Sequence, residues 1–343
     1  MIEQAVEHLP VVAPVLVVAC LLSFGLAVAL RPWFMRYAMA RPNARSSHRT
    51  PTPQGGGIAV VTATLAAAWG ATLLSPVLLQ SHGSQWIAVT VATVLLAVVG
   101  AVDDVRPLPE LVRLGAQFIA VGAVIAALPS DFQIVPELPH WLERGCLLLG
   151  GVWLVNLVNF MDGVDWMTVA ELVPITATLV LLGLGGTIAP LPTVVTTALL
   201  GGMLGFAPLN KPVARLFLGD VGSLPIGLLL GWLLLHLAGT GYRTAALLLP
   251  LYYLADATIT LGRRIVRREP FWQAHRSHFY QRATDNGFAI PQIVARVFLV
   301  NLVLAALALV SVAADSAVVS LLVLALGAAS VAALLFTFAS ARL

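Results

Sequence analysis

The sequence is built from long apolar runs, each near the ~20 residues that a helix needs to cross the hydrocarbon core of a bilayer. The 343-residue chain is 59% hydrophobic and only 10% charged, which leaves too few charges to cover the surface of a soluble domain. We therefore expect an all-α, polytopic membrane protein with one integral membrane domain over residues 1–343. About eleven spans are predicted, at residues 11–30, 56–79, 86–102, 111–128, 145–161, 167–186, 191–207, 221–238, 244–261, 293–313 and 316–338.

The positive charges indicate how these spans are oriented. Of the 19 Lys and Arg residues, only Arg144 and Arg243 lie on the connections that follow even-numbered spans. The positive-inside rule then places the opposite connections in the cytoplasm, with the N-terminus outside and the C-terminus inside. Before the first run, Glu3 and Glu7 occur without any Lys or Arg, which favours an uncleaved span over a signal peptide. The net charge of +3 thus reflects membrane topology, and nucleic-acid binding is not expected.

Five aspartates lie at the predicted cytoplasmic ends of spans: Asp103, Asp104, Asp162, Asp165 and Asp220. Charges beside a membrane are costly and are usually paired or functional. A salt bridge to a nearby arginine is the better interpretation of any single aspartate. Because the five come from three separate segments, the whole set favours a site for a divalent cation.

The Asp103-Asp104 pair ends the third predicted span. Neighbouring side chains on a helix point about 100° apart, so both can reach one ligand only where the helix stops. Pro107 and Pro109 predict such a stop.

A polar stripe is predicted on the fifth span, where Asn156, Asn159 and Asp162 recur every three residues. Such a stripe can be a seam for helix packing. The turn from Asp162 to Asp165, directly after the span, favours a ligand site instead.

Two glycine-rich segments could bind anions. Residues 219–223 open the eighth span as Gly-Asp-Val-Gly-Ser, and a helix N-terminus attracts phosphate, although a plain cap by Asp220 is the alternative. Residues 55–57 are three glycines that follow His48 and Arg49, with a bare flexible loop as the alternative.

The long connection at 262–292 is rich in arginine and histidine. His275 and His278 could be a metal pair, but we favour contact of these side chains and Arg276 with a phosphorylated substrate. Binding of anionic lipid headgroups is the less specific interpretation. Asp256 lies within the ninth predicted span and needs a partner, such as Arg263, Arg264 or a polar neighbour.

Taken together and in their order along the chain, these motifs resemble the polyprenyl-phosphate N-acetylhexosamine-1-phosphate transferases of glycosyltransferase family 4. That family includes phospho-MurNAc-pentapeptide translocase and the enzymes that start O-antigen and related glycans. The loop at 275–282 looks more like the O-antigen-initiating branch, because the translocase carries a triple histidine there. The matching segments are His48 with Pro51-Thr-Pro-Gln-Gly-Gly, Asp103-Asp104, Asn156 to Asp165, Phe217 to Ser223, Asp256-Ala-Thr and the His/Arg-rich loop.

The resemblance implies transfer of a sugar 1-phosphate from a UDP-N-acetylhexosamine to undecaprenyl phosphate, with release of UMP. It implies Mg²⁺, with Mn²⁺ as an alternative, and a multi-pass location among the lipids of the bacterial inner membrane. The polysaccharide it would start is an O-antigen of lipopolysaccharide or a similar cell-envelope polymer. A homodimer is compatible with the sequence, which does not fix the oligomeric state.

The resemblance also implies roles for individual residues. Asp220 would ligate the metal, and the catalytic pair Asp103 and Asp104 would face the lipid phosphate as base or orienting group. The acceptor is already mostly dianionic at pH 7, because its second pKa is near ~6, so a base matters less than placement. A two-step route through an aspartyl-phosphate stays open. The substrate would contact His48, Asn156, Asn159, Asp162, Asp165, His275, Arg276 and His278.

One position departs from the family pattern. The family has glycine where this chain has Trp166, directly after Asp165. Tryptophan is bulky and is not expected at positive φ, so we expect the neighbouring sugar contacts to differ.

Two other classes of function are weighed against the enzyme. A secondary transporter of a phosphorylated or anionic substrate would place ionisable groups near the midplane of two related halves. Here the acidic residues lie at one face, and the halves show no symmetry. A passive scaffold for glycan enzymes would not require five clustered aspartates.

Overall fold

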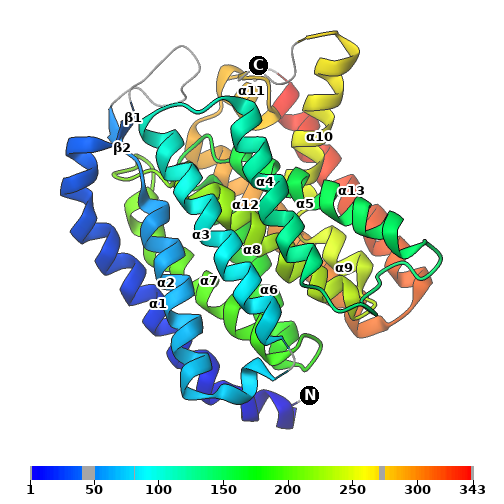
Figure 1. The fold of residues 1–343 in the computed structure, drawn as a ribbon. Helices are drawn as coiled ribbons and strands as arrows, with labels where there is room; N and C mark the ends of the chain where they lie inside the picture. Colours follow the sequence, from blue (N-terminus) through cyan, green and yellow to red (C-terminus); the bar gives the residue numbers. More distant parts are fainter. Residues whose placement is uncertain (1, 41–50, 81, 270–274, 341–343) are drawn as a thin grey trace.

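Long helices packed side by side make up the computed structural model, which describes residues 2–40, 51–80, 82–269 and 275–340, with side chains from residue 11 onward (Figure 1). The two chain ends lie at opposite ends of the helix bundle (Figure 1). The elements are α1 (Ile2–Tyr37), β1 (Met39–Ala40), β2 (Thr52–Pro53), α2 (Gly56–Leu74), η1 (Pro76–Leu79), α3 (Gly83–Val105), α4 (Glu110–Ala126), α5 (His140–Met161), α6 (Met167–Leu184), α7 (Pro190–Asn210), α8 (Asp220–Gly239), α9 (Arg243–Leu248), α10 (Leu251–Val266), α11 (Phe279–Asp285), α12 (Ile290–Ala314) and α13 (Ala317–Ala339).

Nine helices in the described part of the chain are long and apolar enough to cross a membrane. The chain is therefore an all-helical polytopic membrane protein, apart from two strands of two residues each. Of the remaining predicted spans, 111–128 forms α4, which has 17 residues. The run at 244–261 is divided between α9 and α10, because Pro250 has no N–H to continue the helix. A total of about eleven crossings stays a prediction.

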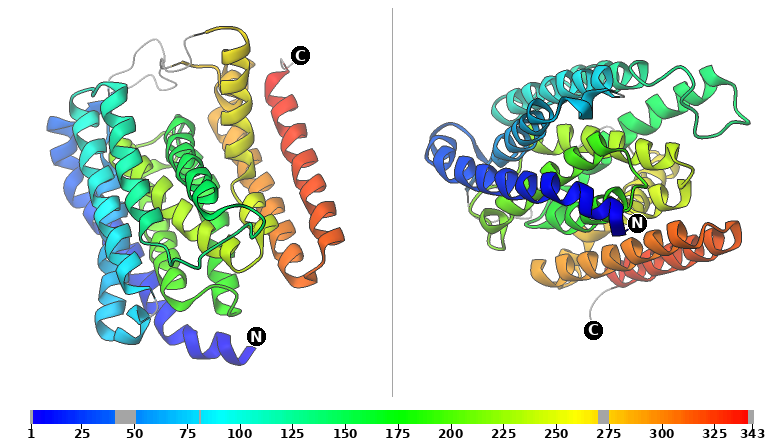
Figure 2. Two further views of the ribbon diagram at one scale, coloured as in Figure 1. Left: turned by 45° about the vertical axis from the view of Figure 1, so that its right-hand side comes forward. Right: turned by 90° about the horizontal axis from the view of Figure 1, so that it is seen from below.

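The most apolar helices are not all equally buried. α6, α7 and α8 form the inside of the bundle. In α8, 89% of the residues in its 18-residue apolar segment are buried against other helices. In α13 the share is 28%, so most of its apolar surface faces outward, as expected for a helix in contact with lipid. Figure 2 shows α12 and α13 as an outer pair on one side of the bundle.

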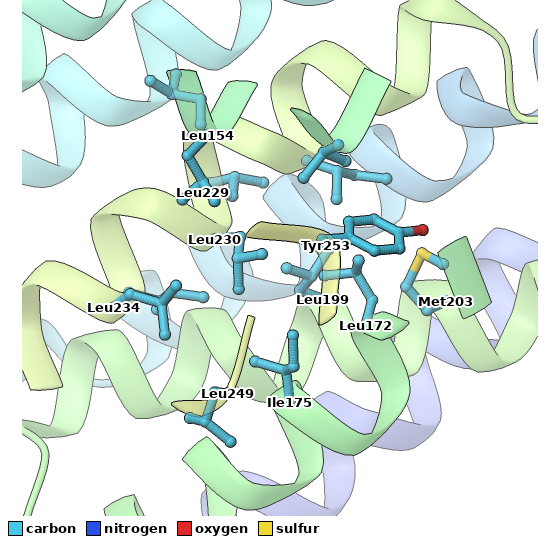
Figure 3. Close-up of a cluster of buried hydrophobic side chains, with 14 of the residues drawn as sticks. Leu154, Leu172, Ile175, Leu199, Met203, Leu229, Leu230, Leu234, Leu249 and Tyr253 are labelled. Atoms are coloured by element: carbon cyan, nitrogen blue, oxygen red, sulfur yellow. The ribbon is translucent and has the colours of Figure 1, made fainter. Parts of the chain in front are cut away.

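The centre of the bundle is filled by aliphatic side chains from α5 to α10 (Figure 3). Leu172 of α6 lies there near Leu199 and Met203 of α7 and the ring of Tyr253 from α10, while Ile175 of α6 lies nearer Leu249 (Figure 3). Because lipid is as apolar as leucine, such contacts stabilise a membrane protein by close packing rather than by exclusion of water. This packing holds α8 in place, and α8 begins at the candidate site.

Backbone contacts join α2 and the segment before it to the start of α8. Gln54, two residues before α2, forms a bridge with Phe217 in the connection before α8, and Gly57 donates its N–H to the carbonyl of Leu218 at 2.8 Å. A Cβ on Gly57 would lie 2.2 Å from the Cα of Gly222, so α2 and α8 touch backbone to backbone. The close approach of Gly57 to Gly222 requires glycine at both positions.

Candidate functional site

A cavity of about 730 Å³ lies at the end of the bundle where α8 begins. Its lining comes from the segments before α2, after α5 and before α8, from the end of α3 and from the first turn of α12. Four of the five predicted aspartates line it, namely Asp104, Asp162, Asp165 and Asp220. The described residues of the lining include no Lys, Arg or His. The cavity is therefore acidic.

Asp104 caps the helix that begins with Asp220. Its Oδ1 accepts the backbone N–H of Asp220 at 2.9 Å, and its Oδ2 accepts that of Val221 at 3.1 Å. Carboxylates at a helix N-terminus satisfy amides that have no partner within the helix and interact favourably with its dipole. The side chain of Gln54 donates to the carbonyl oxygen of Asp104 at 2.7 Å, which connects this cap to the segment before α2.

Asn159 positions the side chain of Asp220. Its Nδ2 donates to Asp220 Oδ1 at 2.8 Å and to Ser223 Oγ at 2.9 Å. The other carboxylate oxygen of Asp220 lies 3.8 Å from Arg113 Nη1, and the side chain is 28% exposed. The structure thus brings the predicted stripe on α5 and the predicted metal ligand into contact.

Asp103 is turned away from the cavity and is not part of its lining. Its Oδ1 accepts the N–H of Leu108 at 2.6 Å, and its Oδ2 lies 2.8 Å from Arg113 Nη1. The helix stop predicted at Pro107 does occur, since α3 ends at Val105. Arg113 was not predicted as part of the site, because the arginines of the sequence indicate mainly the orientation of the spans.

Asp162 follows the last residue of α5 and accepts a hydrogen bond from the hydroxyl of Thr168. Burial, together with the charges of Asp104 and Asp165, raises the pKa of this carboxyl to about 7, against the lowering effect of the hydrogen bond from Thr168. Its carboxyl group is therefore partly protonated near neutral pH. A hydrogen bond to a ligand could be donated or accepted there.

Asp165 and Trp166 connect the turn after α5 to the segment before α8. Asp165 Oδ2 accepts the N–H of Ala214 at 2.9 Å, and the N–H of Trp166 donates to Asn210 Oδ1 at 2.8 Å. Trp166 has φ of 63°, so the expectation that tryptophan would not take this conformation is wrong. The indole N–H donates to the carbonyl of Ala207 at 2.7 Å, which helps to offset the cost of a positive φ.

Asn210 is a second residue that the sequence analysis missed. It lines the cavity, it is buried, and its Nδ2 donates to the carbonyl of Leu216 at 3.0 Å. An asparagine that ends a span next to a proline-containing segment was the available signal.

Asn156 lies elsewhere. Its amide pairs with that of Gln117 on α4, and its Nδ2 also donates to the carbonyl of Val152 at 2.8 Å. It is not part of the lining of the cavity. At this position the stripe on α5 serves helix packing, which was the alternative interpretation.

His278 faces a buried carboxylate instead of the cavity. Its Nδ1 lies 3.2 Å from Oδ1 of Asp256, which is fully buried and also accepts the N–H groups of Phe279 and Tyr280 at 3.0 and 3.3 Å. Asp256 thereby caps α11. The expected partner of Asp256 is thus a polar neighbour, His278, and not Arg263 or Arg264. The first amides of α11 are further partners.

The other residues predicted in this loop also lie outside the lining. His275 Nδ1 is 2.8 Å from the hydroxyl of Ser277, and burial, together with the charges of His278 and Arg264, lowers the pKa of His275 to about 4. Arg276 bonds within its own loop, to Asp285 at 3.1 Å. His48 and Arg49 lie outside the described residues.

The fit of the cavity to a metal depends on one carboxylate. Within the described residues, no group of three or more His, Cys, Asp or Glu side chains is placed to share a metal ion. The five aspartates do not form one ligand set, since Asp103, Asp104 and Asp165 bind backbone amides. Mg²⁺ keeps several waters and takes one or two carboxylates together with phosphate oxygens of a substrate. Asp220, partly exposed in an acidic cavity, fits that requirement.

Comparison with known proteins identifies relatives of the chain. Residues 86–238 match glycosyl transferase family 4. The chain is 26% identical over 314 residues to the probable undecaprenyl-phosphate N-acetylglucosaminyl 1-phosphate transferase of Bacillus subtilis, covering 86% of this chain and 84% of the relative. It is 29% identical over 295 residues to decaprenyl-phosphate N-acetylglucosaminephosphotransferase of Mycobacterium leprae, covering 76% and 74%. Identity to phospho-N-acetylmuramoyl-pentapeptide-transferase of the same organism is 26% over 351 residues, covering 85% and 94%.

Proposed function

Because the chain belongs to glycosyl transferase family 4 and is a polyprenyl-phosphate sugar-1-phosphate transferase, we propose that it transfers N-acetylglucosamine 1-phosphate from UDP-N-acetylglucosamine to undecaprenyl phosphate. An oxygen of the lipid phosphate attacks the sugar-bearing phosphorus, and the bond from that phosphorus to the bridging oxygen of the donor breaks, so that the bridging oxygen leaves with UMP. UMP leaves, and the product is a lipid-linked diphosphate sugar. This step initiates lipid-linked glycan synthesis, with an O-antigen or a similar envelope polysaccharide as the polymer.

The acidic lining of the cavity is the observation that supports this proposal most. A diphosphate donor and a monophosphate acceptor repel one another, and four carboxylates would add to that repulsion. A bound Mg²⁺ would neutralise phosphate charge and orient the donor. Asp220 would hold it, with Mn²⁺ as a substitute, and Asn159 fixes the orientation of the Asp220 carboxylate.

The two residues of the proposed catalytic pair, Asp103 and Asp104, lie in different places relative to the cavity. Asp104 lines the cavity and fixes the start of α8, so it would place the lipid phosphate relative to Asp220. Asp103 would act from behind it through Arg113. Since the acceptor is mostly dianionic at pH 7, placement contributes more than proton removal.

The donor is proposed to occupy the part of the cavity around the turn after α5. Asn159, Asp162 and Asp165 line it there, and Phe217 is the aromatic side chain among the described lining residues. Hydrogen bonds from carboxylate and amide groups fix polar ligands, and an aromatic face can stack on a base. His48, His275, Arg276 and His278 stay predicted contacts, whereas Asn156 is assigned to helix packing against Gln117.

We place the protein in the bacterial inner membrane, in contact with its lipids, with the N-terminus outside and the cavity facing the cytoplasm. The distribution of Lys and Arg supports this orientation. The arrangement would let a soluble nucleotide sugar reach an acceptor that is held in the bilayer. A homodimer is compatible with it.

Release of UMP by the purified protein tests the proposal. With undecaprenyl phosphate and Mg²⁺, we expect turnover of UDP-N-acetylglucosamine, and weak or no turnover of UDP-N-acetylgalactosamine or UDP-MurNAc-pentapeptide. Asp220→Asn should abolish turnover while the protein still inserts in the membrane, and Asp131→Asn, at an exposed aspartate, should not affect it. Uptake of the nucleotide sugar into vesicles without release of UMP would support the transporter instead.

A further inference from the structure

Arg113, in the first turns of α4, lies between two of the aspartates. Its Nη1 is 2.8 Å from Asp103 Oδ2 and 3.8 Å from Asp220 Oδ2. The shorter distance is a charge-assisted hydrogen bond, and the longer one is an attraction between charges without a hydrogen bond. The guanidinium of Arg113 therefore offsets the negative charge of Asp103 more strongly than that of Asp220.

The two carboxylates differ in how they are held. Both oxygens of Asp103 have partners, Leu108 N–H and Arg113, and its side chain is 9% exposed. Asp220 is 28% exposed and lines the cavity, with Asn159 on its Oδ1. Asp103 thus anchors the guanidinium, which reaches over the outer oxygen of Asp220.

We propose that Arg113 is a positioning residue that serves as the counter-ion of Asp220 in the substrate-free enzyme and competes with the divalent cation for that carboxylate. The inference rests on the proposed function, in which Asp220 ligates the metal. A cation that arrives at Asp220 meets a positive charge 3.8 Å from the oxygen that it would bind. The metal would therefore bind weakly to the empty enzyme.

Substrate phosphate changes this balance. An arginine has five N–H donors, so Arg113 can keep its bond to Asp103 and still donate to a phosphate oxygen. The negative phosphate would then offset the repulsion between guanidinium and metal. The anchored arginine would couple binding of the metal to binding of a phosphorylated substrate, so that the two enter the site together.

Binding of Mn²⁺ to the purified, substrate-free protein tests this inference without any measurement of turnover. Electron paramagnetic resonance gives the concentration of free Mn²⁺ and hence the Kd. Arg113→Gln removes the competing charge, so we expect its Kd to be about three- to tenfold lower than that of the wild type, the scale of one partly exposed charge. Arg113→Lys keeps the charge and should stay within about twofold of the wild type.

A second variant gives a change of opposite sign. Asp103→Asn removes the anchor of Arg113, which leaves the guanidinium to pair with Asp220, and we expect Mn²⁺ to bind several-fold more weakly. If Arg113 and Asp103 merely supported the fold, Arg113→Gln and Asp103→Asn would change the Kd for Mn²⁺ in the same direction. If Arg113→Gln does not fold, Asp103→Asn together with Arg113→Lys still tests the idea.

The inference and the proposed function fail in different ways. If Asp220→Asn binds Mn²⁺ like the wild type, the proposed role of Asp220 is wrong. If Asp220→Asn loses Mn²⁺ binding but Arg113→Gln binds it with the same or a higher Kd, the competition by Arg113 is wrong and the metal site stands.

Discussion

The carboxylate of Asp104 accepts the backbone N–H of Asp220, 116 residues further along the chain, at a distance of 2.9 Å. The same carboxylate accepts the next amide, from Val221. One predicted catalytic aspartate, Asp104, thus fixes the helix start that carries the predicted metal ligand, Asp220. Placement of Asp220 depends on its own side-chain partners and also on the end of α3.

The cap can be tested by Asp104→Asn. An amide keeps one acceptor oxygen for α8 but presents an NH₂ group to the second amide, so one hydrogen bond is lost. We expect a loss of about 1 kcal/mol in stability and a more than tenfold lower rate of UMP release. Asp103→Asn should also cost more than tenfold in rate without removing the cap. Thermal melts and initial rates measure the two effects, and an Asp104→Asn enzyme with normal turnover would move the acceptor site elsewhere.

Asp162 makes the stability of the protein depend on pH. Its pKa is about 7 in the folded protein and near 3.8 when unfolded, so the folded state binds more protons between these values. Stability from this group is therefore present below pH 4 and is lost as pH rises through 7. We expect a loss of about 1 kcal/mol between pH 6 and pH 8.

Thermal melts at pH 6 and pH 8 measure this loss. Asp162→Asn should remove the part of the difference in melting temperature between pH 6 and pH 8 that this carboxyl contributes. Asp131→Asn should retain the wild-type difference. A wild-type protein that melts at the same temperature at both values would contradict the raised pKa.

The two histidines of the connection at 262–292, His275 and His278, should have separable effects. His278 is buried against Asp256, so His278→Ala should lower stability by about 1–3 kcal/mol. His275 is half-buried, and burial lowers its pKa to about 4, so it is neutral at pH 7. His275→Ala should leave the melting temperature nearly unchanged.

Kinetics then decide the role of this loop in substrate binding. Replacing both histidines by alanine is predicted to raise the KM for the donor. If His275→Ala alone raises it while stability is unchanged, the loop contacts the donor directly. An unchanged KM in both variants would leave the loop with lipid or structural contacts only.

Gly100 lies where α3 crosses the start of α8. A Cβ at this position would be 2.3 Å from the carbonyl oxygen of Asp220. We expect Gly100→Ala to push the helices apart, with a cost of about 1–3 kcal/mol and a rate more than tenfold lower. Gly115→Ala is the matched control, since a Cβ there meets nothing within 4 Å. It should keep full activity and gain up to about 1 kcal/mol. Equal effects of the two changes would disprove the role of the crossing.

The sequence was informative where a residue's own neighbours determine its role. Apolar runs near span length predicted the helices, and the spacing of Asn159 and Asp162 predicted that both reach one site. The division between α9 and α10 could have been predicted from Pro250, which lies within the apolar run at 244–261.

The remaining features depend on contacts between segments far apart in the chain. Nothing local to Asn156 shows that its partner is Gln117 on another helix, whereas Asn159, one turn later, meets Asp220. Likewise, a tryptophan at positive φ is disfavoured by its own backbone, and only the carbonyl of Ala207 and the side chain of Asn210 explain why Trp166 adopts it. Arg113 gains its significance only when α4 packs beside α3 and brings it to Asp103.

The glycine crossings of α8 have a mechanical consequence. At Gly57 and Gly100 its backbone touches α2 and α3 directly, with no layer of side chains that could rotate or slide. We therefore expect that wall of the cavity to be stiff and to keep Asp104 and Asp220 at a nearly constant separation. Any widening of the cavity is expected to come from segments that are held by side-chain hydrogen bonds instead of backbone crossings, such as the turn at 162–166.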